Sequence, residues 1–216
     1  MIKAVIFDLD GTAADTLDDL TSAMNTMLTH FGYPKRSREE IRSFLGFGQT
    51  VFVTESLPEY ARSAENVQKC VQYYDSYYAS HSVVLTRAFD GIPEILEKLH
   101  EKGIKTAIFS NKNQSHVDTI ISKIIDRSLL DAVLGAGEVK HKPDPEGVLI
   151  LAEKFGVSPS ECVIVGDTEI DILTAKNSSA RALGVTWGFR SREQLENCGA
   201  TDIADNAEEL AEILGL

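Results

Sequence analysis

The chain has 216 residues, of which 43% are hydrophobic and 25% are charged, and its formal net charge is -12. This length suits one domain or a core with a smaller insertion, and the composition is typical of a soluble globular protein. The acidic excess disfavours general affinity for nucleic acid or anionic membranes, although a metal and a lysine could still make a local site for an anionic substrate.

The N-terminus reaches Asp8 after one short apolar run. It lacks the long apolar region and the cleavage site of a secretory signal, so we expect a cytoplasmic protein. No apolar run approaches the roughly 20 residues that span a bilayer, and we expect no membrane partner. The three cysteines form no Cys-x-x-Cys pair, which argues against a disulfide framework or a zinc site.

Short apolar runs rich in β-branched residues recur along the chain, with amphipathic stretches between them. The first run covers residues 3–9, and the later ones cover 104–109, 132–135, 162–165 and 181–186. Such runs are typical of buried parallel strands. Their alternation with helices predicts an α/β fold with a doubly wound, Rossmann-like parallel sheet.

The segment between the first two apolar runs breaks this alternation. Its apolar residues, from Leu17 to Phe31, recur at helical spacing, and residues 67–78 form another helical stretch. We therefore expect an inserted all-helical cap domain at residues 16–85, and an α/β core domain made of residues 1–15 and 86–216.

Polar residues follow four of the apolar runs, where an open parallel sheet binds its ligands. These are Asp8 and Asp10, then Ser110 and Asn111, then Lys142 after a loop, then Asp167 and Asp171. Carboxylates gathered in one crevice repel one another unless a cation lies among them, and Mg²⁺ prefers such oxygen ligands. With Lys142, Ser110 and the amide of Asn111 as partners for phosphate oxygens, the pattern predicts a phosphate site. A carboxylate there could attack phosphorus, and a second could move protons.

Four motifs in this order resemble the haloacid dehalogenase superfamily, and within it the phosphoglycolate phosphatase-like branch. They are Phe7-Asp8-Leu9-Asp10-Gly11-Thr12, Ser110-Asn111-Lys112, Lys142-Pro143-Asp144-Pro145 and Gly166-Asp167-Thr168-Glu169-Ile170-Asp171. The resemblance implies Mg²⁺-dependent hydrolysis of a small phosphorylated metabolite, with 2-phosphoglycolate as the best guess, through an aspartyl-phosphate. It is compatible with a monomer or a homodimer.

The resemblance also implies a role for each matching residue. Asp8 is the expected nucleophile, Asp10 the acid and base, and Lys142 the catalytic cation. The expected metal ligands are Asp8, the carbonyl of Asp10, Asp167 and Asp171. The expected phosphate-binding residues are Gly11, Thr12, Ser110, Asn111 and Lys142.

Other interpretations stay open at this point. A phosphosugar mutase of the β-phosphoglucomutase type, or a pyrophosphatase, would share the core motifs and differ in the cap. A catalytically silent binding or regulatory protein would keep the fold alone. Ser110 could be only a helix N-cap. We expect Lys112 to be solvated, the five histidines to be structural or at the surface, and the tyrosines of residues 73–78 to pack within the cap. The Gly46-Phe47-Gly48 turn is a weaker candidate for reaching the cleft.

Overall fold

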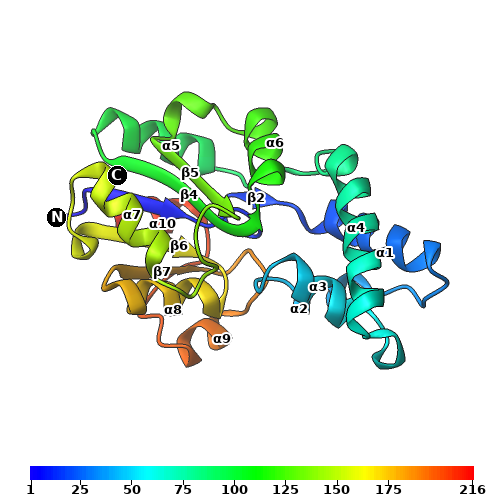
Figure 1. The fold of residues 1–216 in the computed structure, drawn as a ribbon. Coiled ribbons are helices and arrows are strands. Elements are labelled where there is room, and N and C mark those ends of the chain that lie inside the picture. The colour runs from blue at the N-terminus through cyan, green and yellow to red at the C-terminus, as the bar shows by residue number, and fades with distance from the viewer.

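The computed structural model describes all 216 residues and has a six-stranded parallel sheet at its centre (Figure 1). The strand order is β5-β4-β1-β6-β7-β8. The strands are β1 (Ala4–Phe7), β4 (Lys105–Asn113), β5 (Ala132–Ala136), β6 (Cys162–Gly166), β7 (Arg181–Val185) and β8 (Asp202–Ala204). Later strands are added on both sides of β1, so the strand order reverses there, which is where such sheets bind ligands. The predicted α/β Rossmann-like core is confirmed.

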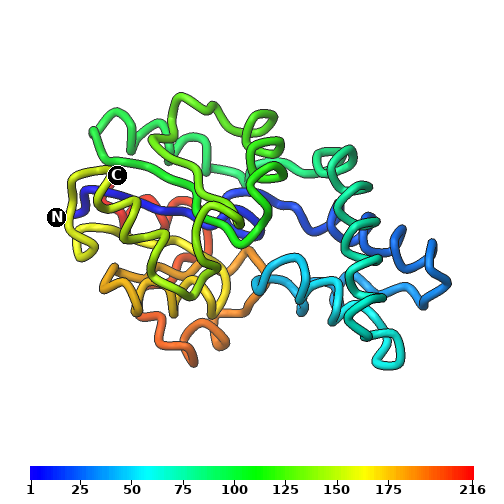
Figure 2. Tube along the Cα trace, in the orientation of Figure 1, coloured from blue at the N-terminus to red at the C-terminus, as the bar shows by residue number.

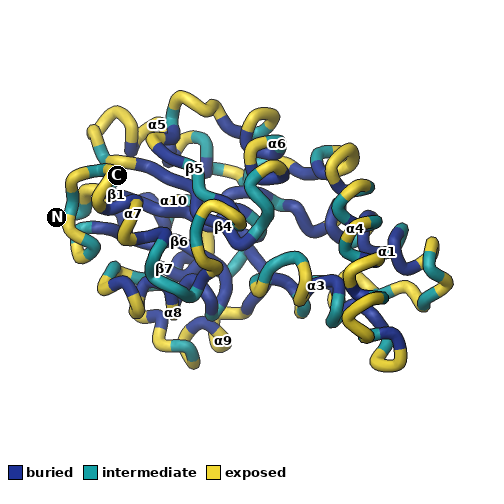
Figure 3. The backbone as a smooth tube through the Cα atoms, in the orientation of Figure 1, coloured by how far each residue is buried: buried dark blue, intermediate teal, exposed yellow.

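Helices cover both faces of the sheet because successive side chains of β1 point to opposite faces. Val5 and Phe7 pack with α5 (Ile92–Glu101), α6 (Gln114–Ile124) and α10 (Ala207–Leu214). Ala4 and Ile6 pack with α7 (Glu146–Phe155) and α8 (Glu169–Ser178), and α9 (Arg192–Asn197) packs on α8. Short 3-10 helices lie at η1 (Glu59–Ala61), η2 (Arg127–Leu129) and η3 (Pro159–Glu161). Figure 3 shows the central strands buried between these layers.

Four helices lie between the first strand and the rest of the sheet in sequence. They are α1 (Leu17–His30), α2 (Arg38–Ser43), α3 (Gln49–Ser56) and α4 (Ala64–His81). Their buried side chains, such as Met24, Phe52 and Tyr74, form a hydrophobic cluster of their own, joined by Phe189 from the core. Figure 2 shows this helical segment at one end of the molecule and both chain termini at the other. No helix of the chain is both long enough and apolar enough to cross a membrane.

The chain crosses between the core and the helical segment twice, and the two crossings lie side by side. β2 (Ala14–Asp15) pairs antiparallel with β3 (Arg87–Ala88). The Asp19 carboxylate accepts hydrogen bonds from the amides of Val84 at 2.9 Å and Thr86 at 2.8 Å, and from the Thr86 hydroxyl at 2.8 Å. It also accepts from the amide of Leu85. The first helix of the segment therefore holds the returning chain.

Candidate active site

Three carboxylates meet at the carboxyl edge of the sheet. Asp8 directly follows β1, Asp167 directly follows the neighbouring β6, and Asp171 lies in the first turn of α8. One oxygen from each lies within 4.8 Å of the others, and all three residues are buried. The topology thus brings together side chains that are up to 163 residues apart, counting from Asp8 to Asp171.

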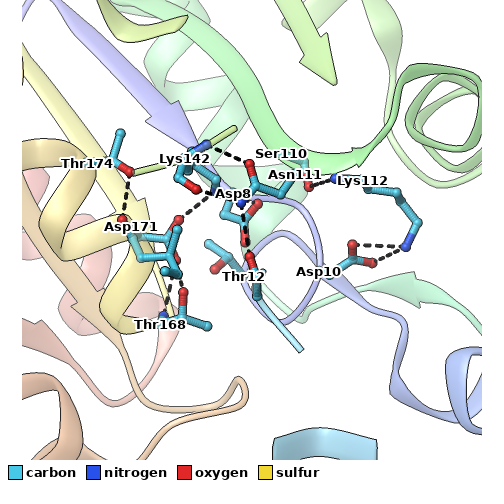
Figure 4. A network of polar contacts seen from close by, with 12 residues as sticks. Asp8, Asp10, Thr12, Ser110, Asn111, Lys112, Lys142, Thr168, Asp171 and Thr174 are labelled. Carbon is cyan, nitrogen blue, oxygen red and sulfur yellow. Dashed lines mark hydrogen bonds and ion pairs between the residues drawn. The ribbon is translucent and has the colours of Figure 1, made fainter. Parts of the chain in front are cut away.

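Lys142 lies among these carboxylates (Figure 4). It comes from the loop between β5 and α7, and its Nζ lies 2.9 Å from Asp8 Oδ1 and 2.6 Å from Asp171 Oδ1. Its side chain is only 3% exposed. One fully buried ammonium therefore pairs with two of the three buried carboxylates.

Burial and the excess of carboxylates raise the pKa values of two of them. Burial raises the pKa of Asp8 to about 6; Asp171 and Asp10 act in the same direction, whereas the Lys142 ammonium opposes them. Burial, with Asp171 and Asp8, also holds the pKa of Asp167 well above its usual range. Asp8 Oδ1 is buried and accepts no hydrogen bond, because its contact with Lys142 is an ion pair outside hydrogen-bond geometry. This set of oxygen atoms fits a hard divalent cation.

The position of Asp167 is fixed by the loop after β1. The Thr12 hydroxyl donates to Asp167 Oδ1 at 2.7 Å, and the Phe189 amide donates to Oδ2 at 2.7 Å. Gly11 has φ 84°, and a Cβ there would collide with the Asp167 carboxylate. The amides of Gly11 and Thr12 donate within their own loop, to Ala14 and Leu9. Their expected role in binding phosphate stays a prediction.

Asp171 has two partners of different kinds. Its Oδ1 accepts from Lys142, and its Oδ2 accepts from the Thr168 amide at 3.1 Å and hydroxyl at 2.8 Å, which caps α8. The N-cap interaction and the ion pair therefore fix one carboxylate in one orientation.

Asn111 holds the loop that carries Lys142. Its Oδ1 accepts from the Lys142 amide at 2.7 Å, and its Nδ2 donates to the Lys142 carbonyl at 3.0 Å. Ser110 is also buried, at 3% exposure. The alternative that Ser110 caps a helix is wrong, because α6 begins only at Gln114 and its N-cap residue is Asn113.

Asp10 faces Lys112 and does not join the other carboxylates (Figure 4). Lys112 Nζ donates to Asp10 Oδ1 at 2.7 Å and to Oδ2 at 2.9 Å. The Lys112 side chain is only 8% exposed, so the expectation that it is solvated is wrong. β4 continues beyond Phe109 to Asn113, which keeps Lys112 inside the fold.

A cavity of about 60 Å³ separates these residues from the helical segment. The core contributes Asp8, Asp10, Ser110, Asn111, Lys112 and Lys142, and the helical segment contributes Leu45, Gly46, Gly48, Gln49, Phe52, Tyr74 and Tyr78 among others. Asn111 Nδ2 also donates to the Gly46 carbonyl at 3.1 Å, so the Gly46-Phe47-Gly48 turn does reach the cleft. The tyrosines pack in the helical cluster as expected, although Tyr74 and Tyr78 also line the cavity.

The family model for haloacid dehalogenase-like hydrolases matches residues 5–185 of the chain. The chain belongs to this family. It is 30% identical to a phosphoglycolate phosphatase from Vibrio parahaemolyticus, over 100% of this chain and 97% of that one. It is 28% identical to phosphoglycolate phosphatase 1 from Pseudomonas aeruginosa, over 96% of this chain and 78% of that one.

A solved structure agrees with this assignment. The crystal structure of a candidate phosphoglycolate phosphatase from Lactobacillus delbrueckii subsp. bulgaricus superposes with a TM-score of 0.92 at 34% identity, and 98% of each chain is covered. The predicted resemblance to the phosphoglycolate phosphatase-like branch of the haloacid dehalogenase superfamily is therefore confirmed.

Two further residues lie near the site of this haloacid dehalogenase-like hydrolase. Arg190, which is 7% exposed, pairs with Glu169 at 2.8 Å and donates to the Leu45 carbonyl at 3.1 Å. His116 is buried and lies 2.8 Å from Asp75 Oδ1, which confirms a structural position for that histidine. An arginine in a loop carries no distinctive pattern, so nothing in the sequence singled out Arg190.

Proposed function

We propose that this chain is a Mg²⁺-dependent phosphatase that hydrolyses a small phosphate monoester through an aspartyl-phosphate on Asp8. The enzyme class, a phosphoric monoester hydrolase, follows from the family and from relatives that are phosphatases. The observation that carries the mechanism is the buried triad of Asp8, Asp167 and Asp171, in which a single lysine pairs with only two of the carboxylates. Such a site requires further positive charge and is suited to bind a metal together with a phosphate.

In this proposal, Asp8, Asp167, Asp171 and the carbonyl of Asp10 would hold Mg²⁺. When bound, the ion would neutralise charge on the phosphoryl oxygens and on the carboxylates. Lys142 and Ser110, both buried beside Asp8, would hold the remaining phosphoryl oxygens. Asn111 would act indirectly, because it fixes the backbone of Lys142 on both sides.

The reaction would take place in two steps. An oxygen of Asp8 attacks phosphorus, the bond from phosphorus to the ester oxygen breaks, and Asp10 gives a proton to the departing alkoxide. Asp10 then takes a proton from a water molecule that attacks the same phosphorus. Inorganic phosphate leaves, and Asp8 returns to a free carboxylate.

We propose that residues 16–85 form a cap domain, here called the cap, and that residues 1–15 and 86–216 form the core domain. The cap's own hydrophobic cluster and the paired crossings β2 and β3 support this division. Closure of the cap would exclude bulk water during phosphoryl transfer. The cavity of about 60 Å³ suits a compact substrate. The names of the relatives support 2-phosphoglycolate, and we expect a cytoplasmic monomer or homodimer.

The test is phosphate release from a panel of phosphorylated metabolites with Mg²⁺ present. We expect turnover of 2-phosphoglycolate, and a loss of at least about 10³-fold in kcat for Asp8→Asn. Asp118→Asn is a matched control, because Asp118 is an exposed acid on α6 whose side chain accepts a hydrogen bond from Gln114 and contacts none of the site residues. An active Asp8→Asn enzyme would contradict the nucleophile. Transfer of the phosphoryl group back to a sugar, without free phosphate, would favour the mutase alternative.

A further inference from the structure

Two lysines line the cavity, and they are paired in different ways. Lys142 lies between Asp8 and Asp171, which stay with the phosphate and the metal. Lys112 pairs with one carboxylate alone, that of Asp10, at 2.7 and 2.9 Å from its two oxygens. Its Nζ also lies 4.8 Å from the ring centroid of Tyr78, a favourable distance for a cation above an aromatic ring. The charge of Lys112 is therefore balanced only by the proposed acid and base.

While Asp10 is paired with Lys112, it cannot donate the proton that the proposed reaction requires. Both oxygens of Asp10 accept hydrogen bonds from Lys112, and Figure 4 shows Asp10 turned towards Lys112 and away from Asp8. To protonate an ester oxygen bound at Asp8, Asp10 has to leave Lys112. The ammonium, only 8% exposed, would then remain buried beside the Tyr78 ring without an anionic partner, which is strongly unfavourable.

We propose that Lys112 binds a second anionic group of the substrate, located on the leaving group, and that Asp10 occupies this place when substrate is absent. The inference rests on the proposed function, since it needs Asp10 as the acid. A carboxylate or a second phosphate would supply the same charge. Lys112 and Lys142 line the same cavity, so the second anionic group and the phosphate would belong to one small substrate.

If this group replaces Asp10 on Lys112, a fast reaction requires a leaving group that carries an anionic group. An anionic group on Lys112 displaces Asp10, which becomes free to turn to the ester oxygen. A phosphate ester whose leaving group is neutral leaves either Asp10 held by Lys112 or Lys112 without an anionic partner. Lys112 is thus a specificity-determining residue, because a site built for one polar group rejects an analogue that lacks it.

The test compares kcat/KM for three phosphate esters with Mg²⁺ present: 2-phosphoglycolate, 2-phosphoglycolamide, in which the leaving group is neutral, and the bisphosphate of ethane-1,2-diol. We expect the wild-type enzyme to prefer 2-phosphoglycolate to the amide by about 10²-fold or more. In Lys112→Met we expect this ratio to fall close to one, mainly through loss of activity on the acid. Lys69→Met is the control, because Lys69 is 60% exposed on α4 and should leave the ratio unchanged.

A preference for 2-phosphoglycolate over the bisphosphate identifies the bound group as a carboxylate, and the reverse preference identifies it as a phosphate. A wild-type enzyme that uses the amide as well as both anionic esters overturns the inference. So does a Lys112→Met enzyme that is slower on all substrates with an unchanged ratio, since Lys112 would then act only on Asp10. Lys112→Arg, which keeps the charge, should retain most of the ratio.

Failure of the inference is distinguishable from failure of the proposed function. In the first case, phosphate is still released in a reaction that needs Asp8, and only the ratio is insensitive to Lys112. In the second case, no ester is hydrolysed by the wild-type enzyme, or Asp8→Asn remains active. Thermal unfolding of each variant shows whether it is folded. If Lys112→Met does not fold, the wild-type ratio of kcat/KM for 2-phosphoglycolate to that for the amide still tests the inference.

Discussion

The carboxylates of Asp8, Asp167 and Asp171 carry more charge than Lys142 can neutralise, and this imbalance should be measurable without any substrate. A cation that binds the folded chain stabilises it in proportion to the logarithm of its concentration over its dissociation constant. At 100 times that constant the gain is about 2.7 kcal/mol, or roughly 5–10 °C in Tm for a chain of this size. We therefore expect Mg²⁺ to raise the Tm of metal-free protein, as measured by calorimetry.

Asp167→Asn separates this effect from nonspecific screening by salt. Asparagine keeps an oxygen acceptor for Thr12 or Phe189 but removes one negative charge from the triad. The increase in Tm with Mg²⁺ should therefore be much smaller in Asp167→Asn than in Asp118→Asn. An equal increase in both variants would mean that the ion binds elsewhere.

The sequence predicts the meeting of the carboxylates with Lys142 well, but it does not predict the contacts of Lys112 and Arg190. Asp8, Asp167 and Lys142 follow apolar runs at one edge of a parallel sheet, so their meeting follows from topology. The pairing of Lys112 with Asp10 joins residues 102 positions apart, and neither residue's local pattern indicates it. Arg190 is similar, because Glu169 lies 21 positions away and its other partners are backbone carbonyls, which any residue type could supply.

At the scale of elements, the returning chain is held to α1 by the Asp19 carboxylate. Burial acts to raise the pKa of Asp19, but hydrogen bonds from Thr86, Leu85 and Val84 outweigh it and hold the pKa below its usual range. Asp19→Asn keeps one acceptor and loses the charge, and a charge-assisted hydrogen bond contributes about 1.5–3 kcal/mol. We expect a loss of about 2 kcal/mol in the free energy of unfolding, measured by urea denaturation.

The effect of Asp19 should depend on pH with a definite sign. Because its pKa is lowered in the folded state, its contribution is complete above the ordinary carboxyl pKa of about 4 and disappears as the pH falls through the folded value. The difference between wild type and Asp19→Asn should thus be constant from pH 6 to 8 and shrink below about pH 4. Asp18→Asn is the control, since Asp18 is 50% exposed and pairs only with Arg38. A difference that grows in acid would refute the assignment.

Sequence patterns indicated the long elements and missed the short ones. The apolar run at residues 3–9 and the helical spacing from Leu17 onwards are long enough to show their periods. β2 and β3 have two residues each and β8 has three, so no alternation can appear in them. The pairing of β2 with β3 depends on the tertiary structure, because the chain enters and leaves the helical segment at the same place.

At the scale of the whole molecule, a small set of polar contacts joins the cap to the core. The Arg190 guanidinium donates to the carbonyls of Leu45 at 3.1 Å and Arg42 at 3.4 Å, near the end of α2. Arg42 in turn donates to the Gly188 carbonyl. On the other side of the cavity, Asn113 donates to Gln49 at 2.8 Å. No sequence pattern predicts such contacts, because they exist only for one relative position of the two parts.

Arg190 is well placed to hold the helical segment against the core, because it also pairs with Glu169, the first residue of α8. The same helix carries Asp171, so the position of the cap and the geometry of the site share one element. Arg190→Met keeps the length of the side chain and removes its donors. At about 0.5–1.5 kcal/mol for each lost hydrogen bond, the closed state should become roughly tenfold less favoured relative to an open one.

Hydrogen exchange of residues 46–49 tests this expectation, because Gly46, Gly48 and Gln49 line the cavity between the helical segment and the core. We expect faster exchange there in Arg190→Met, together with a larger radius of gyration by small-angle scattering. Arg192→Met is the control, since Arg192 pairs with Asp205 on the surface and touches no residue of the cap. If exchange in the turn is the same in both variants, Arg190 contributes to the fold of the core alone. The closed position would then depend on the Asn113 side of the cavity.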